Sequence, residues 1–240
     1  MAGVSVRRAA SYGIDAPIVL AGFGFGVLTC LLTATVTDGP VPLVGAGLLA
    51  LCALVHLHTT VRGKFAVWEE LLDELRPRGD EDVLDLGCGR GSVLLAAARR
   101  LDVGGTAVGV DPWRSLDQAG HDIGATKENA LAEGVADRVQ LRTGELARLP
   151  LLDDSFDLVL SGVAITTVAG ADARALAIRE AVRVLRPGGR IVLAEVGHTR
   201  QYAAALTELG MTQVRRRGLG WRMWWSGPWA PTTLVTARKP

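Results

Sequence analysis

A glycine-rich turn between an apolar run and a helical segment carries the strongest chemical signal in the sequence. The run Val83–Leu86 contains one acid, Asp85, and leads into Gly87–Gly91, with a helix expected from Ser92. Glycines let a ligand approach the backbone, and a helix N-terminus offers free N–H groups. Dinucleotide enzymes hold a pyrophosphate with G-x-G-x-x-G, whose third glycine is replaced here by Ser92. A carboxylate before the turn repels a pyrophosphate but suits the ammonium of a methionine-like group.

A second acid, Asp111, ends the next apolar run, about 20 residues after the glycine turn. At this position a carboxylate accepts hydrogen bonds from both hydroxyls of a ribose, and Pro112 or Trp113 can pack against an adenine ring. Asp111 alone fits a nicotinamide dinucleotide as well as S-adenosylmethionine. After the third run, Glu145 can accept a hydrogen bond from the adenine amino group, and the Leu146 N–H can meet a ring nitrogen.

Three side chains are candidates for a general base, which methyl transfer from a sulfonium needs only if the nucleophile must lose a proton. His121 and Asp122 lie in a polar insertion after the second strand, and His198 follows the fifth. A lone histidine is more often a structural or surface residue, so both interpretations stay open. His56 and His58, near the end of an apolar segment, are expected at an interface rather than as bases.

The elements that position these residues alternate between strand and helix from residue 80 onward. Strands are expected at 82–86, 107–110, 139–142, 158–161 and 190–195, and helices at 92–101, 125–133 and 172–185. Such alternation predicts an α/β fold with a mostly parallel sheet covered by helices on both faces. A final pair, 212–216 and 233–237, is expected to form an antiparallel hairpin. A Pro-Gly-Gly turn at 187–189 is expected to be structural.

Together and in this order, these segments resemble the class I S-adenosylmethionine-dependent methyltransferases over residues 65–240, and the branch with the quinone-biosynthesis C-methyltransferases is the most similar. The run 128–139 also resembles that branch, and the terminal hairpin is a hallmark of the family. The resemblance implies S-adenosylmethionine as cofactor and S-adenosylhomocysteine as product. It implies these site residues: Asp85, Gly87, Cys88 and Gly89 at the methionine side, Asp111 at the ribose, Glu145 and Leu146 at the adenine, and Ser161 beside the sulfonium.

Two departures from the family pattern bear on the substrate. Relatives more often have Asp where this chain has Glu145. After the fourth strand they often carry an aromatic residue or His, whereas this chain reads Ser161–Thr167. The acceptor is therefore not carried over from those relatives. Two rival functions stay open: an NAD-dependent oxidoreductase, which Ser92 and the final hairpin oppose, and a non-catalytic membrane module of the same fold.

The first sixty residues predict a transmembrane hairpin. Segments 17–36 and 43–61 are apolar, each long enough to cross the ~30 Å hydrocarbon layer, and Asp38 in the turn is the one charge between Pro17 and Val61. Basic residues flank the pair and are missing from its turn, which predicts a cell-membrane protein with both termini cytoplasmic. A cleaved signal peptide and a buried hairpin of a soluble protein are the alternatives. Gly22 and Gly26 are expected to allow close helix packing.

The resulting organisation has four parts: a cytoplasmic segment 1–16, the hairpin 17–61, an amphipathic linker helix 62–79 and the methyltransferase domain 80–240. Asp15 is expected to cap the first helix, with a contribution of Tyr12 or Asp15 to an active site at the membrane surface as the alternative.

Composition bears on the partners. Four of the six tryptophans fall within 221–229, which predicts a loop against lipid headgroups or, alternatively, a cover for the domain's core or the hairpin.

Three scattered cysteines give no disulfide framework and no zinc spacing, and no metal is expected. A net charge of +1 gives no reason to expect nucleic acid. The expected partners are a small lipophilic substrate (a quinone or other isoprenoid, a lipid, or an apolar thiol or phenol) and membrane lipid.

Overall fold

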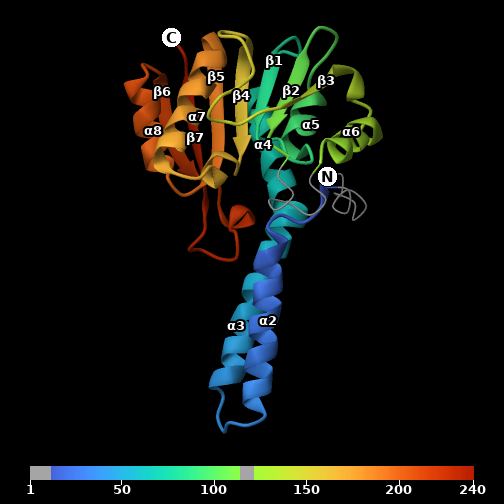
Figure 1. Cartoon of the computed structure of the whole chain (residues 1–240), viewed down its shortest axis with the longest axis vertical. Coiled ribbons are helices and arrows are strands. Elements are labelled where there is room, and N and C mark those ends of the chain that lie inside the picture. The colour runs from blue at the N-terminus through green and yellow to red at the C-terminus, as the bar shows by residue number, and fades with distance from the viewer. Residues whose placement is uncertain (1–11, 114–121) are drawn as a thin grey trace.

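The computed structural model describes residues 12–113 and 122–240 and consists of an α/β domain from which a helical hairpin projects (Figure 1). The sheet has seven strands in the order β3-β2-β1-β4-β5-β7-β6. Their bounds are β1 Asp82–Leu86, β2 Thr106–Asp111, β3 Val139–Thr143, β4 Phe156–Gly162, β5 Leu185–Val196, β6 Thr212–Gly218 and β7 Thr232–Arg238. The first five strands pair in parallel, and β7 pairs antiparallel with both β5 and β6. The predicted fold class, including the antiparallel ending, is confirmed.

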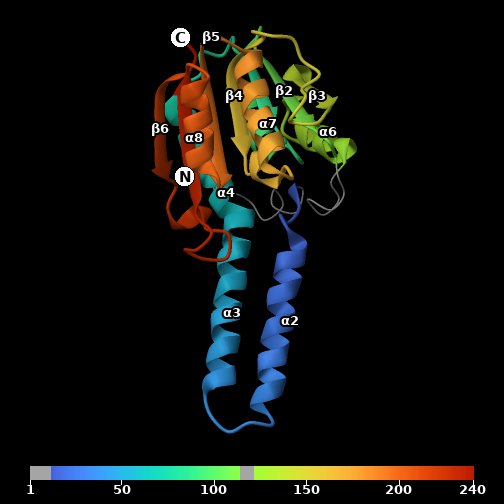
Figure 2. The ribbon, with the colours of Figure 1, turned by 60° about the vertical axis from the view of Figure 1, so that its left-hand side comes forward.

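Helices cover both faces of the sheet and bury a separate core on each. One core lies under α4 Lys64–Leu75, α5 Ser92–Ala98 and α6 Ile123–Ala132, and the other under α7 Ala171–Val184 and α8 Thr199–Glu208. Alternate residues of β1 supply the two cores, since Val83 faces the first and Leu84 the second. Figure 2 shows α7 and α8 side by side in front of the sheet. The sequence reasoning missed α8, whose Tyr202 and Leu206 are buried one helical turn apart.

The hairpin consists of α2 Pro17–Ala34 and α3 Val41–His58, which pack against each other and leave the α/β domain together (Figures 1 and 2). By length and composition both helices are apolar enough to cross a membrane. Gly26 lies at their contact, because a Cβ there would meet the Leu49 side chain at 2.9 Å, whereas Gly22 has nothing within 4 Å. Close packing therefore uses one of the two predicted glycines.

The second hairpin helix continues directly into the amphipathic helix. A π-helical turn, η1 Thr59–Gly63, joins α3 to α4, so that helix runs from Val41 to Leu75. A π turn adds one residue to a helical turn and rotates the following face. It thereby lets α3 point away from the domain while α4 buries its Phe65–Leu72 face on the sheet. The amphipathic helix expected over 62–79 corresponds to the end of η1 and to α4, which continue α3 and end at Leu75.

Candidate active site

A cavity of about 640 Å³ opens at the carboxyl ends of the parallel strands and extends to the base of the hairpin. Parallel α/β sheets characteristically bind ligands at this edge. The strand-end part of the wall comprises Gly87, Cys88, Gly89, Asp111, Pro112, Glu145, Leu146, Gly162 and Val163. The hairpin part comprises Tyr12, Asp15, Ala16, Val19, His56 and Lys64, together with Trp225 and Ser226 from the loop before β7. Most of the predicted cofactor residues therefore share one cavity with residues of the hairpin.

The glycine turn folds tightly because its three glycines hold conformations that side chains avoid. Gly87 has φ +67°, Gly89 has φ +51° and Gly91 has φ +91°. A Cβ at Gly87 would collide with the Cβ of Ala164, which belongs to the loop after β4. The Gly87 N–H donates to the Val110 carbonyl at 2.8 Å, which holds the turn against β2. The turn thereby presents its backbone to the cavity.

Asp85 lies behind this turn rather than in the cavity wall. Its side chain is 1% exposed, and within the described residues neither carboxylate oxygen has a hydrogen-bond partner. Burial raises the pKa of Asp85 well above its usual value, and burial likewise raises the pKa of the Cys88 thiol. An orphaned buried carboxylate next to a glycine cradle fits a cationic ligand group, because an unpaired buried charge is costly. Its contact with the ammonium of the methionine moiety stays a prediction.

Asp111 lies at the end of β2 and binds the turn directly. Its Oδ2 accepts from the Gly89 N–H at 2.9 Å, and its Oδ1 accepts from the Trp113 N–H at 2.7 Å. Carboxylate oxygens accept more than one hydrogen bond each, so this geometry is compatible with two ribose hydroxyls. Pro112 lines the cavity beside it, while the Trp113 indole turns toward Thr143 and donates to its Oγ1 at 3.1 Å. Of the two adenine-packing candidates, the structure places Pro112 in the wall.

Glu145 and Leu146 also line the cavity, as the sequence predicted for the base-binding side. Glu145 is exposed at the rim, and Leu146 is buried and packs into the second core. This arrangement offers a backbone N–H on the buried side and a carboxylate at the mouth.

Ser161 packs behind the cavity, and its expected place beside the sulfonium stays a prediction. It is fully buried and absent from the cavity wall, and its hydroxyl donates to Glu195 Oε1 at 2.7 Å. Glu195 also accepts from the backbone N–H groups of Ala164, Ile165 and Thr166, at 3.0–3.2 Å. It therefore fixes the loop that supplies Val163, Ala164 and Thr167 to the cavity. The sequence reasoning missed Glu195, although an acid ending the apolar run 191–194 signals it.

The two predicted base candidates within the described residues do not lie at the cavity. Asp122 is exposed and caps α6, since its Oδ1 accepts from the Ala125 N–H at 2.9 Å. His198 is exposed in a left-handed conformation at the start of α8 and is not part of the wall. His121 lies outside the described residues. Both described candidates are therefore corrected to surface positions.

Polar side chains instead gather at the hairpin end of the cavity. Lys64 Nζ pairs with Asp15 Oδ2 at 2.6 Å, and the Tyr12 hydroxyl donates to Glu133 at 2.5 Å. Ala16, not Asp15, occupies the N-cap of α2 and has φ +44°. The N-cap expectation for Asp15 is therefore wrong, and the alternative placement of Tyr12 and Asp15 at the cavity agrees with the structure.

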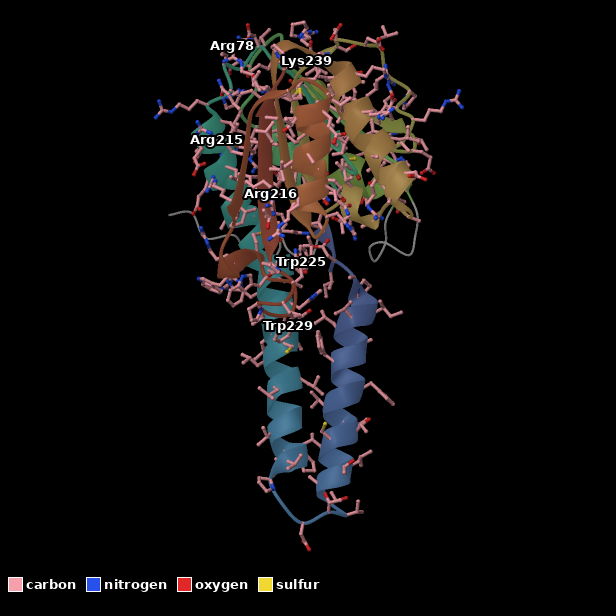
Figure 3. All side chains as sticks on the ribbon, turned by 90° about the vertical axis from the view of Figure 1, so that its left-hand side faces the viewer. Arg78, Arg215, Arg216, Trp225, Trp229 and Lys239 are labelled. Carbon is pink, nitrogen blue, oxygen red and sulfur yellow. The ribbon has the colours of Figure 1, made fainter. Side chains whose placement is uncertain are left out.

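The tryptophan loop packs on the junction between hairpin and domain. The Thr59 hydroxyl donates to the Trp224 carbonyl at 2.6 Å, and Gly63 leaves room for the Arg222 carbonyl, which a Cβ would strike. Figure 3 shows Trp225 and Trp229 at this level, with Arg78 and Lys239 at the opposite end of the domain. Trp221 and Trp229 remain 58% and 68% exposed. The loop thus covers the hairpin end and still presents two indoles outward.

Among residues 12–113 and 122–240, no group of three or more His, Cys, Asp or Glu side chains is placed to hold a metal ion.

Comparison with known proteins finds similarity within the α/β domain. Residues 84–193 match a family model described as a methyltransferase domain. The chain is 39% identical over 127 residues to a nocamycin O-methyltransferase of Saccharothrix syringae, covering 53% of this chain and 42% of the relative. It is 32% identical over 136 residues to a demethylmenaquinone methyltransferase of Lactiplantibacillus plantarum, covering 55% and 52%. The chain thus spans about half the length of the curated relatives it matches.

Solved structures show the same fold. A SAM-dependent methyltransferase from Aquifex aeolicus superimposes with a TM-score of 0.58 at 16% identity, covering 72% of this chain and 89% of that one. A geranyl diphosphate methyltransferase in complex with GPP and sinefungin gives a TM-score of 0.58 at 19% identity, covering 73% and 77%. The glycine turn, the antiparallel β7 and these matches set aside the nicotinamide alternative. The chain thus matches a methyltransferase-domain model over residues 84–193 and shares its fold with S-adenosylmethionine-dependent methyltransferases.

Proposed function

We propose that the protein is a membrane-held enzyme that transfers a methyl group from S-adenosylmethionine to a small lipophilic acceptor. One observation carries this proposal: the cavity that begins at Gly89 and Asp111 continues to Val19, in the first turn of α2. A helix that faces lipid would thus form part of the acceptor's route. An acceptor dissolved in the bilayer would reach the cofactor without crossing bulk water.

The surface of the hairpin supports membrane insertion. Each helix has 18 residues, which spans about 27 Å at 1.5 Å per residue and approaches the thickness of bilayer hydrocarbon. None of the α2 residues is buried, and large apolar side chains such as Ile18, Phe25 and Leu54 are exposed on both helices. A hairpin of a soluble protein would cover such a surface, because soluble domains rarely expose large apolar patches. We therefore place the hairpin in lipid, with both termini and the catalytic domain on the cytoplasmic side.

The names of similar proteins point to chemically different acceptors. Demethylmenaquinone and geranyl diphosphate appear in the names of two of them, and a third, from Halobacterium salinarum, is an arsenite methyltransferase. The acceptor therefore varies widely around one cofactor-binding domain, and we infer the acceptor class from the cavity wall. Val19, Trp68, Met223 and Trp225 make much of that wall apolar.

The residues of this chain would contribute mainly binding and orientation. When bound, the cofactor supplies an electrophilic methyl group on a good leaving group, so placing the acceptor next to it gives much of the rate. Asp111 would hold the ribose hydroxyls, the backbone of the glycine turn would hold the amino-acid end, and Leu146 would hold the base. Glu195 keeps the loop Val163–Thr167 in place beside them.

The test compares two neighbouring substitutions on α2. Val19→Trp narrows the cavity, while Ile18→Trp alters a residue that is exposed and lies outside the wall. Purified protein in lipid vesicles receives labelled S-adenosylmethionine and native lipid extract, and mass spectrometry identifies methylated lipids. We expect wild type and Ile18→Trp to label the same lipid, and Val19→Trp to raise its KM about tenfold or more with unchanged affinity for S-adenosylhomocysteine. A wild-type protein that binds S-adenosylhomocysteine and labels no lipid, or equal KM values for both variants, refutes the proposal.

A further inference from the structure

A serine and a histidine from distant parts of the chain meet in the wall of the cavity. His56, near the end of α3, places its Nδ1 3.1 Å from the Ser226 hydroxyl and its Nε2 3.0 Å from the Asp15 carbonyl. A carbonyl oxygen only accepts hydrogen bonds, so Nε2 must carry the proton. Nδ1 then has a free electron pair that accepts the hydrogen of the Ser226 hydroxyl. The backbone of Asp15 thus fixes the tautomer of His56 in which Nδ1 is basic.

The surroundings hold this pair rigidly and keep it largely dry. His56 is 2% exposed and Ser226 is 7% exposed, yet both residues line the cavity. Ser226 has φ +80°, a conformation that non-glycine residues adopt at a cost and that neighbouring contacts must impose. Trp225 supplies those contacts, since its N–H donates to the Ala230 carbonyl, its indole donates to Thr232, and its ring meets the imidazole edge-to-face at 5.6 Å. Backbone strain at a cavity wall often marks a functional position.

The charges near this pair balance each other. The Asp15 carboxylate pairs with the Lys64 ammonium at 2.6 Å, and both side chains lie in the same part of the wall. Tyr12 completes the polar lining and donates to Glu133. His56 therefore contacts the Asp15 carbonyl, the Ser226 hydroxyl and the Trp225 indole, in a wall that also holds the Lys64–Asp15 ion pair.

We propose that Ser226 and His56 form a proton relay for an acceptor that carries a hydroxyl group, which is methylated on oxygen. This inference rests on the proposed function and names the acceptor chemistry. The hydroxyl proton passes to Ser226 Oγ while the Ser226 proton passes to His56 Nδ1. The acceptor oxygen bonds to the methyl carbon, the carbon–sulfur bond breaks, and its electron pair returns to sulfur, which becomes a neutral thioether. The positive charge of the sulfonium thus ends as a proton on His56, which solvent then removes.

Ser226 is the catalytic residue of this relay, because it would contact the acceptor hydroxyl, and His56 acts through it. A general base contributes typically 10²–10⁴-fold to a rate when the nucleophile must lose a proton. It contributes little when the acceptor is already ionised. The relay therefore predicts that the loss of kcat on replacing His56 or Ser226 is larger for a less acidic acceptor hydroxyl. A purely structural role for His56 would not produce this dependence.

The experiment uses full-length protein in vesicles of phosphatidylethanolamine and phosphatidylglycerol, with two probes: 4-octylphenol and its tetrafluoro analogue, which is ionised near neutral pH. The variants are His56→Gln and Ser226→Ala. The control is His58→Gln, because His58 stacks on Trp221 at 4.7 Å and is not part of the wall. Binding of S-adenosylhomocysteine, measured by calorimetry, reports whether each variant keeps its fold.

We expect wild type to produce the methoxy compound from both phenols. His56→Gln and Ser226→Ala should lower kcat on 4-octylphenol by about 100-fold and on the fluorinated phenol by less than tenfold, with cofactor affinity unchanged. His58→Gln should keep the wild-type kcat on both phenols.

Equal losses on the two phenols, or no loss on either, overturn the relay. A wild-type protein that leaves both phenols unchanged, or methylates carbon only, overturns the acceptor chemistry while leaving the proposed function standing if native lipid is still labelled. Failure to bind S-adenosylhomocysteine or to label any lipid refutes the proposed function itself.

Discussion

The contact between Gly87 and Ala164 provides a sharp test of how the cofactor turn and the loop after β4 depend on each other. Gly87→Ala forces an L side chain to φ +67° and drives its Cβ into the Cβ of Ala164. The left-handed conformation costs about 1–2 kcal/mol, and overpacking adds about 1–3 kcal/mol. The sum is about 2–5 kcal/mol, together with displacement of a loop that lines the cavity.

A matched control separates these two contributions. Gly134 has φ +69°, nearly the same conformation, but a Cβ there meets nothing within 4 Å. Gly134→Ala should therefore cost only about 1–2 kcal/mol, or roughly 2–8 °C in Tm for a protein of this size. Gly87→Ala should lower Tm further and weaken S-adenosylhomocysteine binding at least tenfold, whereas Gly134→Ala should leave binding unchanged. Equal Tm shifts and equal affinities in calorimetry would refute the close packing described for Gly87.

Three further outcomes follow from the site and the hairpin. Asp111→Ala should remove most S-adenosylhomocysteine binding in calorimetry. Asp122→Ala removes only a helix cap, at a cost of about 0.5–2 kcal/mol, and should keep this binding. Wild-type affinity in Asp111→Ala would contradict the ribose assignment. Burial raises the pKa of Glu195, so folding disfavours its ionised form, and the free energy of unfolding should fall as pH rises from the usual carboxyl range through that raised pKa. In denaturant titrations, Glu195→Gln should lack this part of the pH dependence of the free energy of unfolding. The same pH dependence in Glu195→Gln and wild type would contradict a raised pKa for Glu195. Asp38→Cys should react with a membrane-impermeant maleimide added outside intact cells, and reaction only after lysis would reverse the proposed orientation.

The sheet and the cofactor end of the cavity could be predicted because their signals are local. Asp111 and the glycine turn sit at strand ends, and parallel strands bring such ends together whatever the loops between them do. Ser161 also lies at a strand end, yet its side chain points away from the cavity toward Glu195. Sequence position gives the edge of the sheet, but packing decides which side chains reach the ligand.

The hairpin end of the cavity could not be predicted in the same way. His56 and Ser226 are 170 positions apart and meet only because a π turn continues α3 into α4 and the tryptophan loop folds back on it. No periodic pattern marks that turn. The sequence favoured the polar insertion after Asp111, rather than the hairpin, as the source of a general base. Asp122, the residue of that insertion which the structure describes, instead caps a helix.

Within the described residues, the unbroken helix from α3 into α4 connects the hairpin to the domain without a break. A bilayer thicker or thinner than the hairpin would be met by tilting of the hairpin, as is usual for helices of mismatched length. With α4 packed on the sheet, any such tilt would incline the whole domain, pressing Trp221 and Trp229 toward the headgroups or lifting them away. Lipid composition would then govern how readily the acceptor enters, and turnover in vesicles of graded acyl-chain length should pass through a maximum.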